Sequence, residues 1–278
     1  MIPQILVPLY TYPDGNSVNI ATHVGQIAQH LHGDVHGLVL NTKFPPSPGV
    51  MGNMIINIGS MVSEVTAKGH ARGAALAQAM AAVLGQLGVT YRNSETDCFL
   101  GAIGDAAATY ARYHDLVVVG LGKSDVSLQG TAEVVVFGSG RPTLLVPEEE
   151  TAGGYHHVMI AWDGSRVAAR AVADARDFLR LAKTVTVVSV TDEKALSDAD
   201  PAHKLVDYLS RHDINSVVSQ VQTKRRPIAE TLQEHARSIG ADMMVMGAFG
   251  HSRMRDFVLG GATGGILRDL RLPVLLSH

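Results

Sequence analysis

The chain has 278 residues, of which 46% are hydrophobic and 18% charged, and its net charge is −3 at pH 7. This composition is that of an ordinary globular protein and excludes a disordered or fibrous chain. The slightly negative charge provides no basic surface for a phosphate backbone, so nucleic-acid binding is not expected as the main activity. A chain of this length forms one large domain or two domains of about 140 residues each.

The single cysteine, Cys98, cannot form an internal disulfide, which fits a reducing compartment. The first residues, Met1 to Leu9, lack a basic segment ahead of their short apolar run, so they are interpreted as a first strand and not as a signal peptide. We therefore expect a cytoplasmic protein with no membrane partner.

Short runs rich in β-branched residues predict strands, and the segments between them predict helices. In the first half, strands are expected at 4–9, 34–40, 115–119 and 143–146, and helices at about 17–32, 60–87, 102–113 and 131–140. The second half repeats this order, with strands near 157–161, 184–190, 216–221, 242–246 and 273–277, and helices near 165–181, 200–212, 227–239 and 255–269. Such alternation predicts right-handed crossovers and a mostly parallel sheet with helices on both faces.

Residues 148–154 are acidic and then rich in glycine, and they fall where the pattern restarts. We therefore expect two domains, at 1–147 and 156–278, joined by a linker at 148–155. A long irregular stretch that begins at Lys43 has no counterpart in the second half. It is interpreted either as a loop that covers a cleft or a partner, or as a surface insertion.

The most informative motif lies near the end of the chain. Gly247 and Gly250 follow an apolar strand, and nine residues separate Gly250 from Gly260 at the start of the last helix. Asp163 follows the first strand of the same half. Glycines allow close backbone approach, and open sheets place ligands at the carboxyl ends of their strands, so this pattern suits the phosphates of a nucleotide. The alternative is that these glycines form tight turns between strands and helices and hold no ligand.

Both halves resemble the universal stress protein domain, and the whole chain resembles its tandem form. The members of that family that bind ATP carry Gly-x-x-Gly, nine residues and then Gly-Ser/Thr, with an Asp after the first strand; Gly247, Gly250, Gly260 and Asp163 stand at these positions. The resemblance implies an α/β fold of two tandem Rossmann-like (adenine nucleotide alpha hydrolase-like) domains. Each is a five-stranded, mostly parallel sheet with helices on both faces.

The resemblance also implies roles for individual residues. Asp163 would meet the adenine, Val190 or its neighbours would line the base pocket, and the glycines would hold the ribose and phosphates. The candidate positions for nucleotide binding are Ala161, Asp163, Val190, Met246, Gly247, Gly250, His251, Gly260, Gly261, Ala262 and Thr263.

The motif departs from the family pattern at Gly261, which stands where the family has Ser or Thr. Thr263 matches a second hydroxyl position of the family and compensates in this interpretation. His251 follows Gly250 directly and is either a phosphate contact or part of a solvated loop.

The first half carries a weaker copy of the motif, about 130 positions upstream. Gly120 and Gly122 are separated by one residue and not two, and the interval to Gly130 is shorter than nine. Asp14 comes late after the first strand. We therefore expect the first half to act as a packing partner and not as a second ATP site of the family type.

The sequence favours a cytoplasmic stress protein that binds ATP or a related nucleotide, with or without Mg²⁺, in its C-terminal domain. It would act in stress response through interactions that depend on the ligand, and not as an enzyme, although weak ATPase activity is compatible with the site. The alternative is a tandem member that binds no nucleotide and acts as a scaffold or small-molecule binder. An adenylating or phosphotransferring enzyme would need a carboxylate to hold a metal, and Asp256 is the nearby candidate.

Two further expectations concern metals and partners. The histidines do not have the spacing of a zinc site, so no protein-bound metal is expected. The last strand of each half is an edge that needs pairing. The two halves are therefore expected to pack as a pseudo-dimer about an approximate twofold axis, with homodimers a further option.

Overall fold

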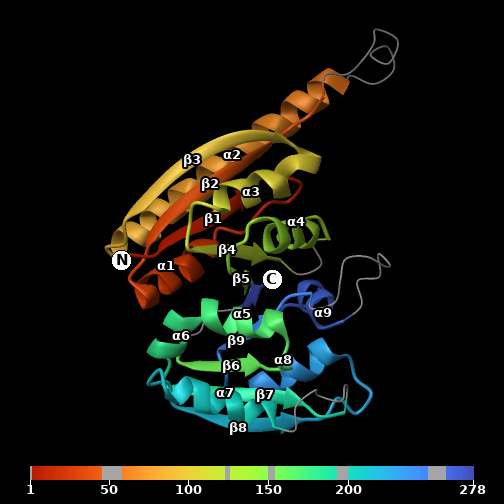
Figure 1. Ribbon diagram of the computed structural model, residues 1–278. Helices are drawn as coiled ribbons and strands as arrows, with labels where there is room; N and C mark the ends of the chain where they lie inside the picture. The colour runs from red at the N-terminus through yellow and green to blue at the C-terminus, as the bar shows by residue number, and fades with distance from the viewer. Residues whose placement is uncertain (1, 46–57, 123–125, 150–153, 193–199, 250–260) are drawn as a thin grey trace.

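The computed structural model describes residues 2–45, 58–122, 126–149, 154–192, 200–249 and 261–278. Its ten strands form one sheet in the order β3-β2-β1-β4-β5-β10-β9-β6-β7-β8 (Figure 1). In chain order, the strands are β1 (Gln4–Tyr10), β2 (Asp34–Lys43), β3 (Tyr91–Phe99), β4 (Leu116–Leu121), β5 (Thr143–Pro147), β6 (His157–Ala161), β7 (Thr184–Val190), β8 (Ser216–Val221), β9 (Met243–Gly247) and β10 (Val274–Ser277).

The helices lie on both faces of this sheet. They are α1 (Ile20–Leu31), α2 (Ile58–Gln86), the 3-10 helix η2 (Leu100–Ala102), α3 (Ile103–Ala111), α4 (Val126–Gly138), α5 (Arg166–Asp174), α6 (Arg176–Leu181), α7 (Pro201–Ser210), α8 (Ile228–Ser238) and α9 (Ala262–Arg268). Side chains from α1, α2, α5, α6 and α7 share one apolar core. Side chains from α3, α4, α8 and α9 share the core on the opposite face.

The central strands are apolar on both sides because both faces of the sheet are covered. In β1, Ile5 and Val7 belong to one core and Leu6 belongs to the other. Within each half, neighbouring strands are parallel. Sequence patterns therefore located these strands well, and the predicted β7 and β8 agree with the structure at both ends.

The two halves are joined edge to edge through their last strands. β5 and β10 pair antiparallel, with Leu144 opposite Leu275. Both side chains are fully buried. This pairing satisfies the backbone groups of two edge strands and relates the halves by an approximate twofold axis. Figure 1 shows β5 and the C-terminus side by side at the middle of the molecule.

A cluster of rings packs where α1 of the first half meets α6 of the second. The imidazole of His30 stacks on Phe178, with ring centroids 5.7 Å apart and an interplanar angle of 17°. The ring of Tyr155 lies 5.7 Å from each of them. Tyr155 and Phe178 are 1% and 3% exposed, so this cluster adds buried apolar contact between the halves beyond the sheet.

Three sequence-based expectations about elements need correction. The fifth strand of the first half, β3, was not located, because it is an edge strand of alternating half-buried and exposed, mostly polar residues. The helix predicted at 165–181 is divided at Ala175 into α5 and α6. The helix predicted at 131–140 begins earlier, at Val126. Most of the irregular stretch after Lys43, at 46–57, lies outside the described residues.

Candidate functional site

The carboxyl ends of β6 and β9 meet in the second half. These strands are parallel neighbours, and Ala161 pairs with Met246. β7 and β8 continue the sheet on one side of this pair and β10 on the other, so the strand order reverses between β6 and β9. Such a switch point leaves a crevice outside the strand ends, where open α/β sheets bind ligands.

The loop after β6 presents Asp163 at this crevice. Its side chain is exposed, and its Oδ1 accepts a hydrogen bond from the backbone N–H of Ser165 at 2.9 Å. The Ser165 hydroxyl in turn caps α5 by accepting from the N–H of Ala168 at 3.2 Å. Gly164 between them has a φ of +72°, which glycine adopts without strain. The loop is therefore held by its own hydrogen bonds, with the carboxylate facing solvent.

Gly247, at the end of β9, is required by packing. A Cβ atom at this position would lie 2.5 Å from the backbone nitrogen of Ala168 and 2.6 Å from the carbonyl carbon of Val167. No side chain fits against the backbone of α5 at these distances. Packing against α5 therefore requires glycine at position 247, whether or not a ligand binds.

The start of α9 lies beside the end of β9. Gly261 has a φ of +110°, a backbone conformation that L side chains rarely adopt, and a Cβ there would meet no described atom within 4 Å. Glycine in place of the family's Ser or Thr therefore coincides with a conformation that favours glycine. Thr263 is 6% exposed, and its hydroxyl accepts a hydrogen bond from the N–H of Phe249 at 3.2 Å. That bond fixes the start of α9 to the β9 segment.

The remaining candidates line the strand ends or lie outside the described residues. Val190 is half-buried at the end of β7, Ala161 is half-buried at the end of β6, and Met246 is 5% exposed. Ala262 begins α9 and is half-buried. Gly250, His251 and Gly260 lie outside the described residues.

Sequence reasoning missed Asp192, two residues beyond β7. Its carboxylate accepts hydrogen bonds from the N–H of Thr223 at 2.8 Å, the Thr223 hydroxyl at 3.0 Å and the N–H of Lys224 at 3.1 Å. These bonds, that from the Thr223 N–H foremost, lower the pKa of Asp192. Asp192 therefore ties the segments after β7 and β8 together next to Val190. No local pattern marks it, because its partners are about 30 positions away.

The C-terminal part of the chain matches a known protein family. Residues 154–278 match the model of the universal stress protein family. The C-terminal half belongs to that family. No curated protein sequence matches the chain.

The fold of the whole chain is that of solved universal stress proteins. The structure of a universal stress protein from Archaeoglobus fulgidus superposes with a TM-score of 0.71 at 17% identity, over 99% of this chain and 96% of that one. A candidate universal stress protein from Pseudomonas aeruginosa superposes with a TM-score of 0.59 at 16% identity, over 99% and 93% of the two chains. The first half therefore has the same fold as the universal stress protein domain in the second.

Two positions at the strand ends of the second half are open among the described residues. Asp163 is exposed at the end of β6, and no described atom lies within 4 Å of a Cβ built on Gly261. Among the described atoms, a Cβ built on Gly164 would touch Pro201 alone, at 3.8 Å. Adjacent strand ends thus combine a carboxylate acceptor with open backbone, which are the groups that a base and its phosphates need.

In the first half, a carboxylate of the protein itself fills the corresponding crevice. Glu148, just after β5, is 3% exposed and accepts hydrogen bonds from Asn16 Nδ2 at 2.6 Å and from the N–H of Ser17 at 2.8 Å. A Cβ on Gly120, the counterpart of Gly247 at the end of β4, would lie 2.2 Å from Glu148 Oε1. The sequence analysis assigned Glu148 to the linker at 148–155. In the structure, Glu148 is instead a buried part of the first half.

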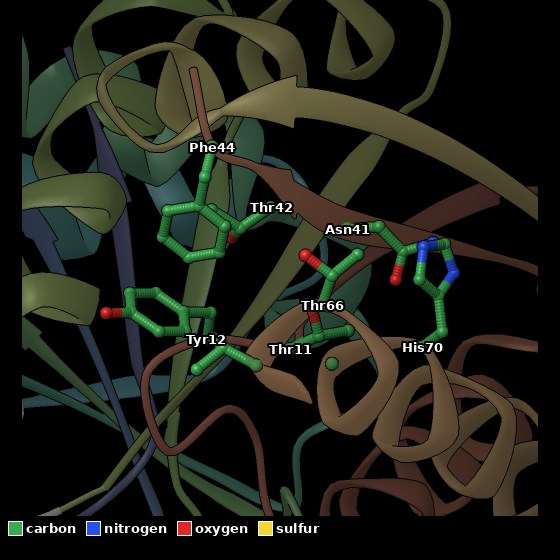
Figure 2. Close-up of a pocket in the computed structure, with 9 residues that line it drawn as sticks. Thr11, Tyr12, Asn41, Thr42, Phe44, Thr66 and His70 are labelled. Carbon is green, nitrogen blue, oxygen red and sulfur yellow. The ribbon is translucent and has the colours of Figure 1, made fainter. Parts of the chain in front are cut away.

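The end of β2 in the first half is closed as well. Figure 2 shows the rings of Tyr12 and Phe44 facing each other beside Asn41 and Thr66. The two rings are 5.2 Å apart at 81°, in an edge-to-face arrangement. Arg72 of α2 donates to the backbone carbonyls of Thr11 and Pro13 at 2.8 and 2.7 Å, which fixes the loop after β1. The space between these side chains is too small to hold a water molecule, so a base could enter here only if the side chains moved.

Two classes of feature are not found among the described residues. No group of three or more His, Cys, Asp or Glu residues is placed to hold a metal. None of the described helices combines the length and hydropathy that a bilayer span needs.

Proposed function

We propose that the universal stress protein domain at residues 154–278 binds ATP or a related adenine nucleotide, and that its occupancy changes the protein's interactions during stress. The observation that carries this proposal is the convergence of Asp163, Val190 and the 261–263 segment at one end of the sheet. They come from segments far apart in sequence, and they surround the switch point between β6 and β9.

Each candidate has a role in this proposal, as the resemblance implies. Asp163 accepts from the amino group of adenine, and Val190 packs against the base. Gly261 and the segment before it, including Gly250 and Gly260, receive the ribose and phosphates. Thr263 supports the start of α9, since its hydroxyl already accepts from Phe249. The nucleotide would bring Mg²⁺ with it, bound through its own phosphates.

The test is calorimetric titration of the full chain with ATP, AMP and dAMP, with and without Mg²⁺. dAMP is included because a universal stress protein from Archaeoglobus fulgidus has been solved in complex with it. Binding of ATP should also raise the unfolding temperature as the ligand concentration rises. The absence of binding at millimolar ATP, AMP and dAMP would leave the alternative of a scaffold or a binder of another small molecule.

Asp163→Asn is the sharpest variant. The N–H of Ser165 holds an oxygen of residue 163 at 2.9 Å, so the new amide nitrogen should point outward. It then presents a donor to the amino group of adenine, and the affinity for ATP should fall at least about tenfold, as expected for a mispaired buried polar contact. Asp14→Asn makes the same change in the exposed loop after β1 and should leave ATP binding unchanged. Equal affinities for the two variants would contradict the proposed pose.

A second measurement separates binding from turnover. Phosphate release from ATP should be slow compared with ATP dissociation, because the proposed role is a change in interactions and not catalysis. Rapid, metal-dependent release would instead favour the enzyme alternative. Co-purification of partners from stressed cells, with and without ATP, then tests whether occupancy alters the interactions.

A further inference from the structure

The first half is hollowed on the face of the sheet covered by α3 and α4. A cavity of about 300 Å³ lies between the end of β1, the η2–α3 segment and the first turns of α4. This volume falls at the lower end of the range for small-molecule sites. It differs from the closed space at the end of β2, although Tyr12 lines both.

The cavity is surrounded by apolar side chains that are unusually exposed. Leu100, Val126 and Val134 line it and are 46%, 77% and 37% exposed, while Ile103 and Leu128 form its buried wall. Exposed apolar groups around a hollow mark a surface that a ligand or partner covers, because burying them gains hydrophobic free energy.

The polar groups of the cavity are one carboxylate and several hydroxyls. Asp105 lies on its rim in the first turn of α3. The Thr131 hydroxyl donates to the carbonyl of Ser127 at 3.0 Å, which leaves the oxygen of Thr131 available as an acceptor. Among the described residues that line the cavity, none carries a positive charge. A hydrogen-bond donor on the ligand would therefore suit Asp105, and an anion would be repelled.

One buried group of the lining is unsatisfied. Tyr10 is 1% exposed, and its hydroxyl has no hydrogen-bond partner among the described residues. Burial raises the pKa of Tyr10, so the hydroxyl stays protonated. Buried polar groups normally have partners, and one left without a partner costs free energy. A polar group of a ligand at the inner end of the cavity would supply the missing hydrogen-bond partner of the Tyr10 hydroxyl.

The charges of the first half argue in the same direction. Glu148 occupies the crevice at the end of β4, where it accepts from Asn16 and Ser17. A polyanion in the cavity would meet the carboxylate of Asp105 and no described cation of the lining. We infer that the first half binds a compact, mostly apolar molecule that is uncharged or cationic and carries a hydrogen-bond donor. This site is independent of the nucleotide proposed for the second half.

Three probes that share one ring test this inference: indole, which is neutral, tryptamine, which is cationic, and indole-3-acetate, which is anionic. Binding to the full chain is measured by ligand-detected saturation-transfer NMR and by calorimetry. Indole and tryptamine should bind, and indole-3-acetate should bind at least tenfold more weakly. Stronger binding of indole-3-acetate, or no binding of any probe at 5 mM, about the weakest affinity that calorimetry follows, would overturn the inference.

Gly130→Leu locates the site. Gly130 lines the cavity from α4, and a Cβ there meets no described atom within 4 Å, so leucine should fill the cavity without a clash. Gly85→Leu is the matched control, because Gly85 is also a helical glycine with open space around its Cβ and does not line the cavity. Binding of indole should be lost in Gly130→Leu and kept in Gly85→Leu. Equal binding in both variants overturns the placement.

Asp105→Asn tests the charge preference. It should weaken the binding of tryptamine at least threefold and leave the binding of indole unchanged. Equal effects on the binding of both probes would contradict the role of Asp105. Asp163→Asn should bind all three probes as the unmodified chain does. Failure of nucleotide binding in the second half and failure of this site are therefore distinguishable.

Discussion

The carboxylate of Glu148 and the amide of Asn16, 132 positions apart in the chain, meet at 2.6 Å in a buried hydrogen bond. Asn16 also accepts from the N–H of Tyr10 at 2.7 Å, so it connects the end of β1 to the residue that follows β5. In the second half, the equivalent crevice presents Asp163 to solvent. The two halves share a fold but differ in what occupies the ends of their strands.

Glu148→Gln should destabilise the protein by about 1–3 kcal/mol. Its two oxygens accept from Asn16 and Ser17, and an amide would place a donor against one of these two donors in a buried site. Urea unfolding at pH 7 measures the loss. Glu149→Gln removes the same charge from an exposed side chain and should change the free energy of unfolding by less than about 0.5 kcal/mol. Equal effects of both variants would mean that the buried pair contributes nothing specific.

Gly247→Ala should be destabilising even without a ligand, by about 1–3 kcal/mol or more. The new methyl group would lie 2.5 Å from the backbone nitrogen of Ala168, so β9 and α5 must move apart. Thermal and urea unfolding of the ligand-free protein measure the effect. Gly85→Ala, at an open position in α2, should be neutral or stabilise by up to about 1 kcal/mol, since alanine favours helix. A stable Gly247→Ala protein that has lost only ATP affinity would show that this glycine serves the ligand and not the packing.

A buried pair of histidines should make stability depend on pH. His114 Nδ1 lies 2.9 Å from the carbonyl of Tyr110, which can only accept, so His114 Nε2 is the acceptor for His36 Nδ1 at 3.0 Å. The other ring nitrogen of His36 accepts from the Ser94 hydroxyl at 2.7 Å. Burial, with Arg92 and His114 adding to it, lowers the pKa of His36 from 6.5 to about 4.

The sign of this dependence follows from proton binding. Between pH 6.5 and about 4, the unfolded chain protonates His36 while the folded protein keeps it neutral. The contribution of His36 to the free energy of unfolding is therefore fully present above pH 6.5 and is lost as the pH falls towards 4. Urea midpoints measured across this range should fall with pH, and less steeply in His36→Gln. An NMR titration of the His36 ring with a midpoint near 6.5 in the folded protein would refute the prediction.

The ring cluster between the halves should be a major stabilising contact. Phe178→Ala removes a side chain that is 3% exposed and stacks on His30, and it should cost about 3–5 kcal/mol. Phe99→Ala is the control, because Phe99 is 56% exposed at the end of β3 and its loss should cost less than about 0.5 kcal/mol. Urea unfolding followed by circular dichroism measures both. A loss below 1 kcal/mol for Phe178→Ala would show that the halves do not depend on this cluster.

Local sequence patterns predicted most strands and failed at identifiable places. The ends of β7 and β8 agree with the prediction, because each strand is a short run rich in β-branched residues. β3 was missed because an edge strand needs no continuous apolar run, and its alternating polar residues resemble a loop. The break at Ala175 between α5 and α6 has no proline or glycine to mark it.

The sequence by itself determined the duplicated α/β order, the glycine at 247 and the acidic residue after β6, because these depend on residues close together in the chain. Only the tertiary structure decided that Glu148 fills the first crevice, that β5 pairs with β10, and that a cavity opens beside α4. Each of these depends on side chains and strand edges that meet from distant parts of the chain. Whether such groups leave space or fill it is set by packing in three dimensions, which short sequence patterns do not encode.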